Sequence, residues 1–231
     1  MNIAEALLST SRLTTRDAAI VFAQAGIPIF PCATHGKRPL TQAGFLEATS
    51  DIVQIGAWWA RWPVANIGLP TGSVSGIEVV DVDVTRTASG FAAFDSASAA
   101  GLLEGELARV RTPSRGMHVY FPATAARPQR CWQAASAHID FRANGGYVVV
   151  PPSTLQTENG RVSYRISSVS TASSKPIDAI ALRDFISPRP PRRSHERGVV
   201  TSLEAGRLAH WVSRLREGER NRGLFWAACR L

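Results

Sequence analysis

The chain has 231 residues and a formal net charge of +8, and its length suits one large domain or one domain with a small appendage. Although 45% of the residues are hydrophobic, no apolar run reaches the 18 residues of a membrane-spanning helix, so we expect no membrane partner. The three cysteines are odd in number and form no CxxC pair, which argues against a disulfide framework and a zinc site. Because a signal-peptide pattern is also missing, we expect a reduced, cytoplasmic location.

The positive charge is concentrated near the end of the chain. Residues 1–186 carry 16 Lys and Arg against 14 Asp and Glu, whereas residues 187–231 carry 10 against 4. A basic tail predicts a polyanionic partner such as nucleic acid. A general bias toward arginine with ordinary solvated surfaces would give the same counts, so both interpretations stay open.

The first 72 residues alternate between helical and strand patterns. Apolar residues at helical spacing precede Gly26, and Asp51 is the expected N-cap of a second helix with a tryptophan-rich face. A loop over 35–39 contains Lys37, whose ammonium could bind a phosphate or simply be solvated. The expected elements are a helix over 15–26, a strand over 27–30, a helix beginning after Asp51, and a strand over 66–69.

The stretch over 76–84 is the most informative part of the sequence. It is rich in valine, which is typical of a buried strand, and side chains alternate between the two faces of a strand. Val80 and Val82 therefore face a core, while Asp81 and Asp83 share the opposite face. Two carboxylates this close repel each other unless a cation lies between them, and their oxygens suit Mg²⁺ or Mn²⁺. The alternative is a solvated strand edge.

The next part of the chain predicts mostly strands. His118 and Asp140 alternate with apolar neighbours on two of these strands, and Asn144-Gly145 is a strong turn signal. We therefore expect two hairpins, one with its turn around residues 113–116 and one with its turn around residues 144–145. The expected elements are a helix over 88–104, strands over 107–112, 117–121, 138–142, 147–150 and 162–166, and a helix over 177–186.

The last part of the chain differs in composition. Residues 187–202 are rich in Pro and Arg without periodicity, which is typical of a linker. Helical patterns follow over 203–216 and 221–230, and the second reaches the last residue without a stop signal. We expect a domain over 1–186, a linker over 187–202, and the start of a helical region over 203–231 that continues in a longer protein.

Four ionisable residues lie on predicted strands and alternate with aliphatic residues. If these strands are neighbours, one sheet face presents three carboxylates and an imidazole, the arrangement that two-metal phosphoryl transfer requires. Each residue alone is less specific, since a lone histidine is often structural. The four residues are Asp81, Asp83, His118 and Asp140. Cationic groups beside them would bind the phosphates, and the candidates are Lys37, Arg115, Arg142 and His118.

The motifs around these residues resemble the bifunctional primase–polymerase domain of the archaeo-eukaryotic primase superfamily, which occurs in plasmid, phage and prophage replication proteins. The resemblance covers roughly residues 15–190. Its motifs here are KRP at 37–39, WW at 58–59, ANIG at 65–68, VVDVD at 79–83, TPSRGMHVYF at 112–121, and IDFRANGGYVVVPPS at 139–153. One departure is Arg115, which stands where relatives often carry the first of two glycines.

The resemblance implies an α+β fold with an RRM-like catalytic sheet beside an N-terminal α/β unit, followed by a small helical segment. It implies metal binding by Asp81, Asp83 and Asp140, and nucleotide binding by His118, Ser114 and Arg142. The implied activity is primer synthesis and extension from nucleoside triphosphates on a single-stranded DNA template, with two Mg²⁺ or Mn²⁺ ions and no zinc. A helicase in the same full-length chain is the implied partner.

Three other functions compete with this interpretation. Asp81 and Asp83 after an apolar strand also resemble the nucleophile motif of haloacid-dehalogenase-type phosphatases, but no acidic pair follows Asp140. A metal-dependent glycosyltransferase could use the Asp-x-Asp pattern, which would leave His118 unexplained. A replication module that only binds DNA is the non-enzymatic alternative.

Overall fold

The structure is a computed structural model that describes residues 1–231 except 125, 127, 189–201 and 215–231. The chain divides into two units, Met1–Pro188 and Arg189–Leu231. In the second unit the structure describes one helix, α6 (Ser202–Ser213), where the sequence predicts a helix over 203–216. The predicted helix over 221–230 and nearly all of the predicted linker lie outside the described residues.

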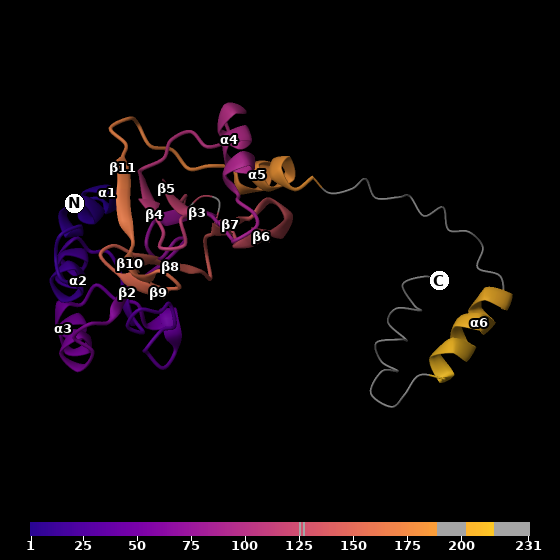
Figure 1. The fold of residues 1–231 in the computed structure, drawn as a ribbon, viewed down its shortest axis with the longest axis horizontal. Coiled ribbons are helices and arrows are strands. Elements are labelled where there is room, and N and C mark those ends of the chain that lie inside the picture. Colours follow the sequence, from indigo (N-terminus) through magenta and orange to yellow (C-terminus); the bar gives the residue numbers. More distant parts are fainter. Residues whose placement is uncertain (125, 127, 189–201, 215–231) are drawn as a thin grey trace. The chain divides into compact units, whose positions relative to one another are not determined.

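Three helices form the N-terminal part of the first unit (Figure 1), and each begins at a side-chain cap. Asn2 caps α1 (Ile3–Thr10), Thr14 caps α2 (Thr15–Gln24), and Asp51 caps α3 (Ile52–Arg61). Their apolar residues share a core with a three-stranded antiparallel sheet in the order β1-β2-β8. Its strands are β1 (Phe30–Cys32), β2 (Asn66–Pro70) and β8 (Tyr147–Val150).

A six-stranded antiparallel sheet forms the rest of the first unit, in the order β11-β4-β5-β3-β7-β6. Its valine-rich strand β3 (Ile77–Val82) is buried at every position and pairs with strands on both sides. The other strands are β4 (Ala108–Arg111), β5 (Met117–Pro122), β6 (Trp132–Ala134), β7 (Ile139–Arg142) and β11 (Arg165–Val169). The mixed α and β architecture expected from the sequence is confirmed, while its RRM-like character stays a prediction.

Both faces of the six-stranded sheet are covered. Val80 and Val82 pack with α4 (Phe91–Ala99) and α5 (Ala179–Ile186), as the valine pattern predicts. On the opposite face, Val79 and Tyr120 belong to the same core as the N-terminal helices. The smaller sheet and its helices therefore pack against much of this second face, which also carries Asp81.

The second predicted hairpin is wrong. Strand β7 pairs with β3 in the large sheet, whereas β8 pairs with β2 in the small one. The Asn144-Gly145 turn is present, with Gly145 at φ +84°, but it carries the chain from one sheet to the other. Asn144 fixes this crossing because its side-chain oxygen accepts from Ser73 N and its amide donates to Gln129 O.

Several boundaries differ from the predicted ones. The first strand begins at Phe30 and not at residue 27, because Phe30 pairs with Gly68 while residues 27 and 28 precede the ladder. The strand predicted over 162–166 is two strands, β10 (Gly160–Ser163) and β11, separated by Tyr164. The pattern did not predict α1, β6 or β9 (Thr154–Thr157). Among the described residues, no helix combines the length and apolarity needed to cross a bilayer.

Candidate active site

The site is built on the central strand of the large sheet. Asp81 of β3 lies directly opposite His118 of β5 on one side and Asp140 of β7 on the other. Residues that face each other across antiparallel strands project their side chains to the same face. The three groups therefore form one row across three neighbouring strands, and all three residues are buried.

Asp83 lies just past the end of β3 and is less buried than Asp81. Its backbone is held on both sides, since its N–H donates to His138 O and its carbonyl accepts from Gly90 N, each at 2.9 Å. Glycine is required at position 90 because a Cβ there would approach His138 O to 2.3 Å. This close packing fixes the direction in which the chain leaves the strand beside Asp81.

Asp140 is held by two donors on the same sheet face. The Arg142 guanidinium lies 2.6 Å from Asp140 Oδ2, and Gln133 Nε2 donates to the same oxygen at 2.9 Å. Gln133 is the register partner of Asp140 on β6. No local sequence pattern identifies Gln133, because its role depends on strand β6, which has no clear pattern of its own.

His118 is a neutral imidazole enclosed by aromatic rings. Burial lowers its pKa to about 3, and the charge of Lys37 acts in the same direction while Asp83 opposes it. Its Nε2 atom lies 3.4 Å from Asp81 Oδ1, so this contact is not an ion pair at neutral pH. The rings of Tyr164 and Tyr120 lie 5.7 Å and 6.3 Å from the imidazole, measured between centroids.

The aromatic enclosure contains polar atoms without partners. His118 Nδ1 and the hydroxyls of Tyr120 and Tyr164 are buried, and none has a hydrogen-bond partner within the described part of the chain. Burial raises the pKa of both tyrosines, so their hydroxyls stay protonated. The sequence offered no signal for either tyrosine beyond an ordinary aromatic residue on a strand.

Burial and neighbouring negative charge disfavour the ionised forms of Asp81 and Asp83. Burial raises the pKa of Asp81 to about 6, Lys37 and Arg142 lower it, and Asp140 raises it. The pKa of Asp83 is raised by burial and then by the neighbouring charges of Asp81 and Asp140. A cation placed beside Asp81 and Asp83 would favour their ionised forms and so oppose these upward pKa shifts.

The expected phosphate-binding residues fall into two groups. Lys37 and Arg142 are close enough to lower the pKa of Asp81, so their charges act on the site. Ser114 and Arg115 lie on the turn between β4 and β5, where Ser114 Oγ lies 3.0 Å from Thr112 Oγ1. Within the described residues neither makes a hydrogen bond or ion pair with the acids.

A divalent cation fits the site by charge and donor type. In the described ranges, no group of three or more His, Cys, Asp and Glu side chains is arranged to hold a metal ion. However, Asp81 and Asp140 face each other in register with raised pKa at Asp81, and carboxylate oxygens are the donors that Mg²⁺ and Mn²⁺ prefer. If Asp140 bound the cation through Oδ2, the cation would share that oxygen with Arg142 and Gln133, which both contact it.

Comparison with known proteins gives a family. A comparison with curated protein sequences finds no match. A family model described as "Bifunctional DNA primase/polymerase, N-terminal" matches residues 19–178, which include every candidate site residue named above. The family is one of DNA- and nucleotide-binding enzymes with nucleotidyltransferase-type activity that generally use divalent metals. This match covers well over half of the chain, which therefore belongs to the family of bifunctional DNA primase/polymerase N-terminal domains.

Proposed function

We propose that residues 1–186 form a template-directed primase–polymerase domain. It would transfer nucleotides from nucleoside triphosphates onto a primer that is paired with a single-stranded DNA template. One observation carries the proposal: Asp81 is flanked in register by Asp140 and His118 on the central strands of one sheet. Two acids and a neutral nitrogen on one rigid face can bind a metal–triphosphate complex without rearranging the backbone.

The chain's own residues account for binding and orientation. Asp81, Asp83 and Asp140 would hold two divalent cations, Mg²⁺ or Mn²⁺, whose chemistry when bound is to activate the attacking hydroxyl and neutralise the triphosphate. His118 is neutral and can donate a hydrogen bond to a phosphate oxygen. Arg142 and Lys37 add positive charge where negative charge accumulates in the transition state. We assign weaker phosphate contacts to Ser114 and Arg115.

The wider setting belongs to the same proposal. We propose an RRM-like catalytic sheet, a linker over 187–202, and a helical region from 203 onward that precedes a helicase in a longer replication protein. We also propose a plasmid, phage or prophage origin, from the family resemblance, and a cytoplasmic location, from the cysteine usage. The basic residues past 186 support a role close to DNA, because they carry most of the net positive charge.

The test is primer synthesis and extension on single-stranded DNA with Mg²⁺ or Mn²⁺, comparing the wild type with Asp81→Asn. We expect loss of incorporation by a factor of about 100 or more, because a charged group that acts in the transition state is removed. Asp95→Asn is the matched control, since Asp95 is exposed on α4. It should leave incorporation unchanged.

Other outcomes would contradict the proposal. DNA binding without any incorporation would indicate a non-catalytic replication module. Release of phosphate from small phosphoesters without a template, lost in Asp81→Asn, would indicate an Asp-nucleophile phosphatase instead.

A further inference from the structure

A groove lined by both polar and apolar residues runs beside the edge strand of the large sheet. It has a volume of about 630 Å³ and lies between the end of α1, the Pro151-Pro152 segment and residues 163–169. Two arginines, Arg12 and Arg165, and several serine hydroxyls line it, and none of its lining residues carries a carboxylate. The serines are Ser11, Ser163, Ser167 and Ser168. Guanidinium and hydroxyl groups of this kind are typical contacts to nucleic-acid phosphates.

Arg165 on β11 lies next to another positively charged residue. Arg165 lies directly opposite Arg111 of β4, and both are exposed. Like charges directly opposite each other on paired strands destabilise a sheet. Within the described part of the chain neither guanidinium makes an ion pair, so the structure shows no internal group that offsets this repulsion.

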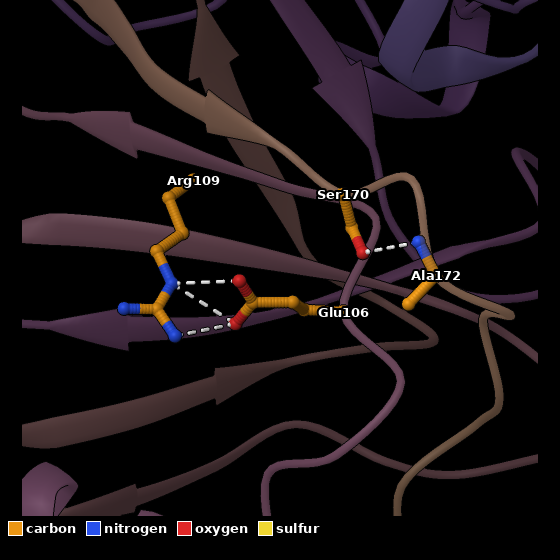
Figure 2. Close-up of polar contacts among 4 residues, drawn as sticks. All are labelled: Glu106, Arg109, Ser170 and Ala172. Atoms are coloured by element: carbon orange, nitrogen blue, oxygen red, sulfur yellow. Dashed lines mark hydrogen bonds and ion pairs between the residues drawn. The ribbon is translucent and has the colours of Figure 1, made fainter.

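The neighbouring arginine on the same face of β4 is different. Arg109 forms a two-pronged ion pair with Glu106 at 2.7–2.9 Å (Figure 2), and its guanidinium lies over the ring of Phe94. Figure 2 also shows where the chain leaves β11, at a turn in which Ser170 Oγ accepts from Ala172 N. Arg109 thus has a structural partner, whereas Arg165, which lines the groove, forms no ion pair among the described residues.

One side chain separates this groove from the candidate active site. Tyr164 lines the groove, and its ring lies 5.7 Å from that of His118. Its hydroxyl is buried and has no hydrogen-bond partner among the described residues. A ligand bound in the groove would therefore lie against Tyr164, the residue whose ring packs beside that of His118.

We propose that this groove binds the sugar–phosphate backbone of a single nucleic-acid strand and leads it past Tyr164 toward the active site. The inference rests on the proposed function for the identity of the strand as template. A free triphosphate is the weaker candidate. Ile166, not Arg165, shares the sheet face of His118, so Arg165 projects away from the carboxylates that would hold a triphosphate. A strand several nucleotides long can reach both places.

The experiment measures binding of a fluorescent single-stranded DNA oligonucleotide to the full chain at several salt concentrations. The variants are Arg12→Gln, Arg165→Gln and the double variant. The control is Arg61→Gln, an exposed arginine outside the groove that loses the same charge as each single variant. We expect the double variant to bind about tenfold more weakly at low salt. The slope of its log binding constant against log salt concentration should become shallower by about 1.4, since each phosphate contact contributes about 0.7 to that slope on a single strand.

The inference would be overturned if the double variant had the same DNA affinity and salt slope as Arg61→Gln, or if the wild type bound no DNA. It would also be overturned if the double variant had a raised nucleotide KM and an unchanged DNA affinity, which would assign the groove to a triphosphate. Polymerisation that survives while the groove variants behave like the control would leave the proposed function intact. Conversely, groove-dependent binding by a chain that incorporates no nucleotide would refute the polymerase function and support the groove.

Discussion

Arg115 adopts a backbone conformation that glycine occupies more easily. It has φ +68° on the turn before β5, the left-handed region in which a side chain is strained. A glycine at this position would adopt the same conformation without that strain. The strained arginine is tolerated because Arg115 N donates to Thr112 O and Thr112 N to Gly116 O, which close the turn.

Two substitutions separate the strain from the charge. Arg115→Gly should be more stable than Arg115→Ala by about 1 kcal/mol, because only the alanine keeps a Cβ in the left-handed region. Both variants lose the guanidinium, so both should raise the nucleotide KM two- to tenfold if it contacts a phosphate. Thermal unfolding and steady-state incorporation measure the two effects. Equal stabilities would contradict the strain, and an unchanged KM would contradict the phosphate contact.

At the scale of elements, a buried polar pair links the central strand to α5. Glu78 of β3 accepts from Gln129 Nε2 at 2.6 Å, and Gln129 also binds the backbone at Ile177 and Ala179, where α5 begins. Burial raises the pKa of Glu78, and the Gln129 hydrogen bond opposes that change. The folded state therefore binds a proton on Glu78 more tightly than the unfolded chain does.

This pKa shift predicts a pH dependence of stability. Because the pKa of Glu78 is raised in the folded state, Glu78 does not destabilise the fold at pH values below its unfolded pKa, where it is protonated in both states. As the pH rises through the folded pKa, ionisation of Glu78 lowers the free energy of unfolding. Glu78→Gln removes the ionisable group and should raise the free energy of unfolding at pH 7 by roughly 0.5–1 kcal/mol. This figure is kept small because solvent screens part of the effect. The substitution should have little effect at pH 4. Denaturant unfolding at both pH values checks this, with exposed Glu158→Gln as the control; a gain that is equal at both pH values would contradict it.

The elements also show what a sequence can predict here. The alternation of polar and apolar residues predicted that Asp81, His118 and Asp140 lie on strands whose opposite face is apolar. The register of those strands makes the three residues neighbours. The Asn144-Gly145 signal predicted a turn but not which sheets it joins, because strand pairing is decided by contacts distant in sequence. Gln133 and Tyr164 gain their roles only from such contacts, so no local pattern could identify them.

At the scale of the whole molecule, charge is divided unequally between the two units. A chain ending at Pro188 removes 10 Lys and Arg against 4 Asp and Glu. Binding to single-stranded DNA should weaken, and its salt dependence should become shallower, because fewer counterions are released. Fluorescence anisotropy at several salt concentrations measures both. An identical slope in the truncated and complete chains would show that these residues do not contact the nucleic acid, while an unchanged melting temperature would verify that the truncated chain is folded.

The row formed by Asp81, His118 and Asp140 has a consequence for how activity is acquired. A slip of one residue between β3 and β5 would turn His118 toward Phe94 and Leu182, and would set Val119 beside the carboxylates. Catalytic competence therefore demands correct alignment of residues 37 and 59 positions apart along the polypeptide, Asp81 with His118 and Asp81 with Asp140. During renaturation, nucleotide incorporation should return in step with formation of the complete sheet and never ahead of it.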